Sequence, residues 1–133
     1  MTQRQTINPA GLFDSQQYGF SQAMVVEGGR RMLLSGQVGV DENENIVEGG
    51  IGPQMLKALD NIDHLLQQAG GNLSHVVMLR IYIAEAARDD QGPIAEALRR
   101  YFPTNPPPSS WIIVTGLSLP EWLIEIEAEA VLP

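Results

Sequence analysis

The spacing of apolar residues predicts two amphipathic helices. From Ile51 to Ala69 apolar residues recur at intervals of three and four, which places them on one helix face, and Gly70-Gly71 is a typical C-terminal stop. A second helix is predicted to begin near Pro93 and to end before Pro103, because proline is tolerated in a first helical turn and interrupts a helix elsewhere. Its apolar side carries Ile94, Ala97, Leu98 and Tyr101 or Phe102.

Other stretches have the composition or alternation of β-strands. The run from Val76 to Ile83 and the run that begins at Trp111 are rich in β-branched and aromatic residues, which favour strands. From Trp122 to Val131 the side chains alternate, so that one face of the predicted strand is apolar and the other is largely acidic. The acidic face carries Glu125, Glu127 and Glu129.

The region before the first helix is predicted to form a β-hairpin. The stretch from Tyr18 to Glu27 is rich in apolar residues, Gly28-Gly29 interrupts it, and a second apolar run follows from Arg31 to Val38. After a polar loop, Ile46-Val47 is a short candidate for extending the hairpin into a meander.

The order of these elements predicts an α+β fold in which two helices cover one face of a mixed sheet. The 133 residues are enough for one core and too few for two ordinary domains, so we expect a single domain spanning residues 1–133. A sheet covered on one side only would leave its second apolar face exposed. We therefore expect the chain to oligomerise.

Composition excludes several kinds of chemistry. Without cysteine there is no disulfide, thiolate nucleophile or cysteine-ligated metal, and the two histidines give little support to any metal site. The net charge of −8 opposes binding to nucleic acid and to anionic membranes. Because the first residues lack the apolar core of a signal peptide and no apolar run is long enough to span a membrane, we expect a cytoplasmic protein.

Several local motifs, taken together, carry a family resemblance. They are FSQA at Phe20–Ala23, SGQ at Ser35–Gln37, Gln54 followed by ALDNI at Ala58–Ile62, LLQQAG at Leu65–Gly70, Val76-Val77, a proline-rich PPPSS ending at Ser110, and EIEAEA at Glu125–Ala130. In this order and spacing the chain resembles the Rid family, also called YjgF-like or endoribonuclease L-PSP-like. The resemblance implies a chorismate-mutase-like subunit and a homotrimer whose sheets form a central barrel, with small-molecule clefts between neighbours.

The resemblance also implies a reaction. Members of the family that are deaminases hydrolyse 2-imino acids or enamines to 2-keto acids and ammonia, without a cofactor. Such chemistry needs a cation for the substrate carboxylate, groups that orient the imine, and an acceptor that positions water. Family position makes Glu125 the water-positioning catalytic residue and Gly36 a point where ligand approaches the backbone.

The chain departs from the family pattern at the substrate side of this cleft. Ser109 occupies the position of the arginine that holds the carboxylate, and a hydroxyl lacks its charge and its bidentate geometry, a loss of about 1.5–3 kcal/mol. Phe20 stands in place of a tyrosine, Ala95 in place of an asparagine and Trp111 in place of a residue that is often cysteine. These changes predict a drier cleft that prefers a neutral or differently charged ligand. The predicted substrate-binding residues are Phe20, Gly36, Ser109, Ser110 and Trp111.

Three functions remain open from the sequence. The first is an imine or enamine hydrolase with weak or absent activity on 2-imino acids, the second a non-catalytic trimer that binds a metabolite or protein, and the third a ribonuclease, which the net charge disfavours. Simpler structural roles compete for each residue. The glutamates could form a solvated strand face, Arg80 could pair with a carboxylate or reach ligand, His64 is expected to be exposed, and His75 to be structural.

Overall fold

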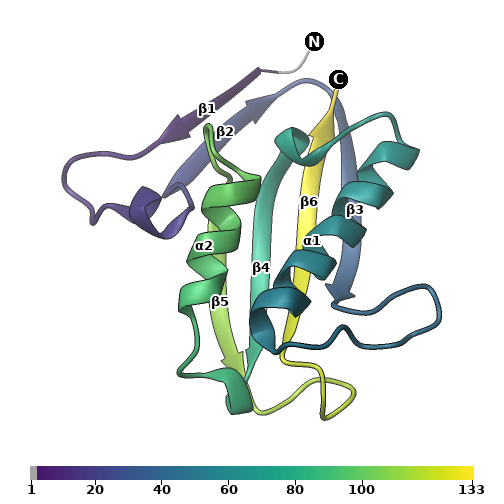
Figure 1. Ribbon diagram of the computed structural model, residues 1–133. Coiled ribbons are helices and arrows are strands. Elements are labelled where there is room, and N and C mark those ends of the chain that lie inside the picture. Colours follow the sequence, from purple (N-terminus) through teal and green to yellow (C-terminus); the bar gives the residue numbers. More distant parts are fainter. Residues whose placement is uncertain (1–2) are drawn as a thin grey trace.

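A computed structural model describes residues 3–133 (Figure 1). Two α-helices and six strands account for most of this range, together with three short 3₁₀ helices. The strands are β1 (Gln3–Ile7), β2 (Ala23–Glu27), β3 (Arg30–Val38), β4 (Val76–Ala84), β5 (Ser109–Val114) and β6 (Ile124–Leu132). The helices are α1 (Ile51–Gln68) and α2 (Gly92–Tyr101), and the 3₁₀ turns are η1 (Ser15–Tyr18), η2 (Leu73–His75) and η3 (Glu85–Ala87).

The main sheet is mixed and has four strands in the order β3-β6-β4-β5. Strand β6 runs antiparallel to both of its neighbours, whereas β4 and β5 are parallel and are joined by the crossover through α2. Both α-helices lie on the same face of this sheet (Figure 1). The predicted α+β arrangement, with two helices on one face of a mixed sheet, is therefore confirmed.

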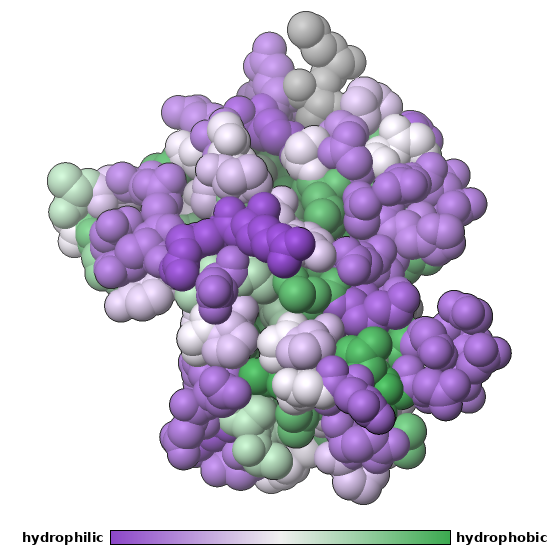
Figure 2. Space-filling view, viewed as in Figure 1, coloured by the Kyte–Doolittle hydropathy of each residue, from purple (hydrophilic) through white to green (hydrophobic). Residues whose placement is uncertain are grey.

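Helix α1 forms where the apolar spacing predicts it. Its buried face, from Ile51 to Leu66, packs on the sheet, and each aliphatic side chain buried there stabilises the fold by about 1.5–3 kcal/mol relative to an exposed one. The helix ends because Gly70 adopts a left-handed φ of +82°, which lets the amide of Gly71 donate to the carbonyl of Leu66 at 2.9 Å. The outer surface on the helix side is largely hydrophilic (Figure 2).

Strand β6 lies inside the sheet, between β3 and β4, and its side chains alternate between the two faces. Ile124, Ile126, Ala128 and Ala130 are buried toward the helices, as the alternation predicts. The intervening glutamates are half-buried and lie on the opposite face, which the helices do not cover. We call this second surface, which carries Glu125, Glu127 and Glu129, the open face.

The predicted hairpin is wrong. Residues 15–18 form η1 rather than strand, β2 begins only at Ala23, and β2 pairs with β1 in a separate two-stranded sheet. Gly28 and Gly29 both have left-handed φ angles, +76° and +79°, and they redirect the chain from one sheet to the other. Ile46 makes only an isolated antiparallel bridge to Val40, so no full meander forms.

Within residues 3–133, no helix combines the length and apolarity needed to cross a membrane.

Candidate functional site

Glu125 lies against the backbone of Gly36. In register, Glu125 has Val38 of β3 on one side and Tyr82 of β4 on the other. Strand β3 carries a register shift between Leu34 and Gln37, and Gly36 falls within it. A Cβ atom built on Gly36 would lie 2.3 Å from Oε2 of Glu125, so the carboxylate occupies the space that any other residue would fill. The structure therefore brings together the predicted water-positioning residue and the predicted glycine.

The carboxylate of Glu125 has no hydrogen bond or ion pair with any side chain or backbone group of residues 3–133. It is half-buried at the central strand, where a carboxylate oxygen can hold a proton or orient water. Glu127 and Glu129, which share its face of the strand, are both paired with cationic or hydroxyl groups. The three glutamates are thus chemically distinct, and Glu125 is the one left available.

Ion pairs run across the rest of the open face. Arg80 donates to Glu129 at 2.9 Å and lies 3.7 Å from Glu127, while Arg31 donates to the second oxygen of Glu129 at 3.0 Å. The hydroxyl of Tyr82 donates to Glu127, which raises the pKa of the phenol. These residues make the centre of the open face charged, whereas Leu33 and Ile112 are apolar and exposed on the same face, so the expected second face is only partly apolar. Arg80 takes the structural alternative, pairing with carboxylates of its own chain.

These ion pairs make stability depend on pH through Glu129. The hydrogen bonds from Arg31 and Arg80 lower its pKa below the ordinary value of 4.5. A carboxyl with a lowered pKa in the folded state stabilises the fold fully above its unfolded pKa, and this contribution disappears as pH falls through the folded pKa.

We expect Glu129→Gln to lower the free energy of unfolding by about 1 kcal/mol at pH 7, since solvent reaches the pair. The difference from the parent protein should shrink below pH 4. Urea unfolding midpoints measured from pH 3 to 8 check this, with Glu48→Gln as a control because Glu48 is exposed and has no ion pair among the residues described. A difference that stays constant with pH would contradict the assignment.

Phe20, Ser109 and Trp111 form a second cluster. The rings of Phe20 and Trp111 are 5.9 Å apart between centroids, and the indole N–H of Trp111 donates to the hydroxyl of Ser109 at 3.1 Å. Ser109 and Trp111 are in register with Leu79 and Ile81, both buried under the helices, so this cluster lies on the helix side of edge strand β5. With Phe13 and Tyr18, these residues line a pocket of about 330 Å³.

The turn η1 positions Phe20 at this edge. Asp14 caps the turn by accepting from the amide of Gln16 at 3.1 Å, and the hydroxyl of Ser15 donates to the carbonyl of Phe20 at 2.7 Å. Gly19 has a φ of +91°, and a Cβ atom there would lie 2.6 Å from the Cβ of Leu98. Only glycine therefore lets the turn pack on α2 and present Phe20 to β5.

The predicted site residues do not all converge within one chain. Gly36 and Glu125 meet on the open face, whereas Phe20, Ser109 and Trp111 meet on the helix side of β5. Ser110 is exposed and in register with Arg80, so it belongs to the open face. The predicted site residues therefore form two separate groups, one on each face of the sheet. The sequence does not indicate Phe13 or Tyr18 as site residues, because Phe13 lies in an irregular stretch before FSQA and Tyr18 falls within the predicted hairpin.

The remaining polar candidates have structural or solvated positions. His64 is exposed, and His75 accepts a hydrogen bond from the amide of Asn72 in a capping box, so both expectations are confirmed. The Nδ1 of His75 serves the backbone, and partial burial lowers its pKa. Among residues 3–133 no three histidine or acidic side chains converge as metal ligands would.

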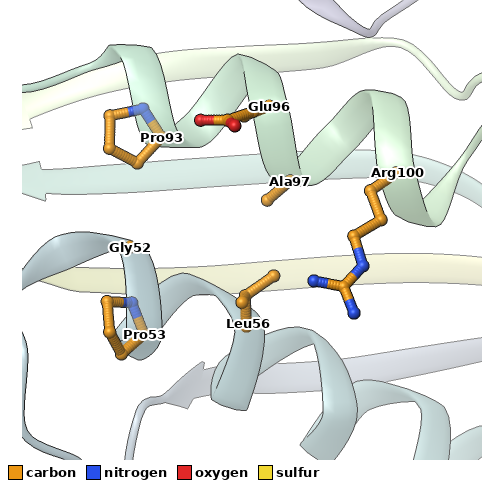
Figure 3. Close-up of a pocket in the computed structure, with 7 residues that line it drawn as sticks. All are labelled: Gly52, Pro53, Leu56, Pro93, Glu96, Ala97 and Arg100. Atoms are coloured by element: carbon orange, nitrogen blue, oxygen red, sulfur yellow. The ribbon is translucent and has the colours of Figure 1, made fainter.

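The predicted site residues do not line two other hollows on the surface. A groove of about 250 Å³ runs between α1 and α2, where Leu56 and Ala97 face each other and Glu96 and Arg100 lie at the rim (Figure 3). A larger, open hollow of about 600 Å³ lies beside α1 and is bordered by Asp41, whose carboxylate accepts from the amides of Asn43 and Asn45. Both lie away from Glu125 and from the Phe20–Ser109–Trp111 cluster.

Comparison with known proteins identifies the family. The model of the family described as "Endoribonuclease L-PSP" matches residues 15–132. The chain belongs to the endoribonuclease L-PSP family, also called Rid or YjgF-like. A Rid-family protein of unknown function from Yersinia pestis has a crystal structure that is 35% identical in sequence, with a TM-score of 0.90 over 97% of this chain and 98% of that one.

Named enzymes of the Rid family are more distant in sequence. The 2-iminobutanoate/2-iminopropanoate deaminase of Rattus norvegicus is 34% identical over 84% of this chain and 79% of its own length. The 3-aminoacrylate deaminase RutC of Acinetobacter baylyi is 34% identical over 74% of this chain and 77% of its own length. These two Rid relatives are thus named as deaminases, one of 2-imino acids and one of 3-aminoacrylate.

Proposed function

We propose that this Rid-family protein hydrolyses a carbon–nitrogen double bond or its enamine form, with Glu125 as the residue that positions and deprotonates water. The observation that carries the proposal is the free, half-buried carboxylate of Glu125 against Gly36, beside two glutamates that are already paired. The deaminase activity of two named relatives supports the reaction class.

In the proposed reaction the oxygen of water adds to the imine carbon while Glu125 accepts one of its protons. Glu125 returns this proton to the imine nitrogen, which gives a neutral amino alcohol. The hydroxyl proton of the amino alcohol then passes to the amino nitrogen as the carbon–nitrogen bond breaks, so that the nitrogen leaves as ammonia. The products are a carbonyl compound and ammonia. An enamine enters the same sequence after it has tautomerised to the imine. No cofactor is required for this hydrolysis.

We further propose that the two separate groups of site residues complete one another between copies in a homotrimer. The separation of Glu125 from Ser109 within one chain supports this, as does Leu33, which is 67% exposed on a strand of the open face. In such a trimer the substrate would lie between Glu125 of one copy and the Phe20–Ser109–Trp111 cluster of its neighbour. Mass measurement in solution tests the assembly, and a stable monomer would contradict it.

Activity on 2-imino acids is expected to be low because Ser109 offers no positive charge to their carboxylate. Its hydroxyl already accepts a hydrogen bond from Trp111, and the pocket around it contains no charged side chain. We expect Ser109→Arg to raise the hydrolysis of 2-iminopropanoate about tenfold or more, from the 1.5–3 kcal/mol of a charge-assisted contact. Ammonia release in a coupled dehydratase assay measures this gain.

Two variants make that comparison specific. Ser109→Gln adds length without charge and should give no gain, while Ser109→Lys adds charge without the planar fork and should give a smaller one. All variants are first checked for parent-like mass and thermal stability. Rapid hydrolysis of 2-iminopropanoate by the unmodified protein would contradict the role given to Ser109.

A non-catalytic binding protein is the second candidate, and the same cluster favours it. The charged anchor is absent at Ser109, although an apolar pocket remains. A folded, trimeric Ser109→Arg protein that releases no ammonia above the uncatalysed rate would support this candidate over the hydrolase.

A further inference from the structure

The pocket on the helix side of β5 is built from aromatic rings. Phe13, Tyr18, Phe20 and Trp111 line it together with Ser109, and none of the five side chains is charged. Phe13 stands edge-on to Phe20 with ring centroids 6.3 Å apart, and Phe20 continues to Trp111 at 5.9 Å. These rings form one continuous apolar wall, which we call the aromatic pocket. Its volume of about 330 Å³ is enough for an aromatic ring together with part of its substituent.

Two of these rings remain exposed in the chain. Phe13 is 60% and Tyr18 45% exposed, an unusual position for large aromatic side chains packed beside one another. Phe13 lies on the loop that follows β1, which projects from the body and carries hydrophobic surface at the left of Figure 2. Covering these rings with an apolar group would remove their surface from water and provides a driving force for binding.

The polar groups of the aromatic pocket define what can enter it. The indole N–H of Trp111 is satisfied by Ser109, so the inner wall presents no unpaired N–H to an anion. The hydroxyl of Tyr18 has no partner among residues 3–133 and can meet a neutral polar atom at the rim. Arg99 is hydrogen-bonded to the η1 turn, where it donates to the carbonyl of Gln17 at 2.6 Å. A carboxylate would therefore lose its water without gaining a charged partner.

The aromatic pocket is also rigidly held. Besides the cap on η1, Asn8 accepts from the amide of Gln22 at 2.8 Å, and the amide of Ser21 donates to the carbonyl of Pro107 at 3.3 Å. These bonds fix the segment that carries Phe20 against the start of β5. A pocket formed in advance binds a rigid ring without a large cost of ordering its own walls.

We infer that the protein selects substrates that carry an uncharged aromatic ring, which packs against Phe20 and Trp111 where 2-imino acid deaminases are expected to hold a carboxylate. This inference rests on the proposed function for the location of the reacting carbon, between the aromatic pocket and Glu125. The ring of the substrate binds in the aromatic pocket, and its carbon–nitrogen bond extends from the pocket toward the carboxylate of Glu125.

Three small probes test the inference by binding alone. Phenylacetamide carries a ring without charge, phenylacetate carries the same ring with a charge, and acetamide lacks the ring. The indole N–H signals of Trp111 and Trp122 are the only two expected in a proton–nitrogen NMR spectrum, and a Trp111→Phe variant assigns them. Phenylacetamide should shift the Trp111 signal saturably, phenylacetate should bind at least about tenfold more weakly, and acetamide should leave the signal in place.

Variants then link the binding to the aromatic pocket. Phe20→Ala should weaken phenylacetamide binding at least about tenfold, whereas Leu119→Ala, an exposed apolar residue outside the pocket, should leave it unchanged. Equal binding of phenylacetate and phenylacetamide would overturn the inference. So would the absence of a saturable shift, which is the result expected if a second copy of the chain covers the rings.

The two proposals fail separately in these experiments. Phenylacetamide binding without ammonia release from any imine would overturn the hydrolase and leave the aromatic pocket standing as a ring-binding site. Ammonia release that depends on Glu125, together with no ring binding, would overturn only the substrate class.

Discussion

Replacing Gln54 by leucine is expected to lower the free energy of unfolding by about 2–3 kcal/mol. Gln54 is 3% exposed in the first turns of α1, and its amide holds the loop that leads into β6. Its Nε2 donates to the carbonyl of Glu121 at 3.0 Å, and its Oε1 accepts from the amide of Leu123 at 2.8 Å. Leucine fills a similar volume but leaves both backbone groups without their partner, and each buried unsatisfied group costs about 1–3 kcal/mol.

The measurement is urea unfolding followed by circular dichroism, at one fixed protein concentration because assembly would couple stability to concentration. Gln67→Leu on the same helix is the matched control, since the side chain of Gln67 is exposed and, within residues 3–133, hydrogen-bonds only to Asp63 one turn earlier. That change should stay within about 0.5 kcal/mol. Gln54→Glu keeps the acceptor for Leu123 but sets a carboxylate against the carbonyl of Glu121, so it should also lower the free energy of unfolding. Equal stability of Gln54→Leu and Gln67→Leu would show that the loop does not depend on this amide.

The elements that sequence predicts best are those that bury one face against a single layer. Helix α1 and strand β6 each have a regular apolar period, of three to four residues and of two, and each packs on the same core. Where the period is clear, the burial follows it residue by residue. The predicted bounds of α1 differ from the observed ones by a single residue at one end, whereas β6 begins two residues later and ends one residue later than predicted.

Pairing between strands was less predictable than the strands themselves. Strand β1 reads QRQTI, which is too polar to predict as a strand, yet it is the strand with which β2 pairs. The two glycines between β2 and β3 are compatible with a tight turn and equally with a change of sheet. Local composition does not distinguish these two paths, because the choice depends on partners far away in the chain.

The candidate site was predicted in parts for a similar reason. Family motifs identified Gly36 and Glu125, and the close approach of the carboxylate to the glycine gives a physical reason for that pair. The same motifs identified Phe20, Ser109 and Trp111, but not that they would lie on another face of the sheet. Alternation along β5 places Ser109 and Trp111 on one face and Ser110 on the other. The sequence did not predict this for the serines, because the predicted strand began at Trp111 and the observed one begins at Ser109.

The general-base role proposed for Glu125 leads to the largest expected effect on activity. In the Ser109→Arg protein, where hydrolysis of 2-iminopropanoate is expected to be faster, Glu125→Gln should lower ammonia release about 10²–10⁴-fold, the usual contribution of a positioned general base. Glutamine keeps the size and a hydrogen-bond acceptor but does not accept a proton at neutral pH. Glu127→Gln is the matched control on the same strand face, because Glu127 is already paired with Tyr82 and Arg80.

Gly36→Ala separates position from charge. The added Cβ would lie 2.3 Å from Oε2, 2.8 Å from Cδ and 2.9 Å from Cγ of Glu125, so the whole side chain must turn away from the methyl group, which its half-buried and unpaired position allows. We therefore expect ammonia release to fall by more than about tenfold while the unfolding midpoint stays near that of the parent. Single-turnover rates beside urea unfolding curves provide both readouts. If Glu125→Gln kept half of the parent rate, or Gly36→Ala were fully active, water would have to be positioned by a different group.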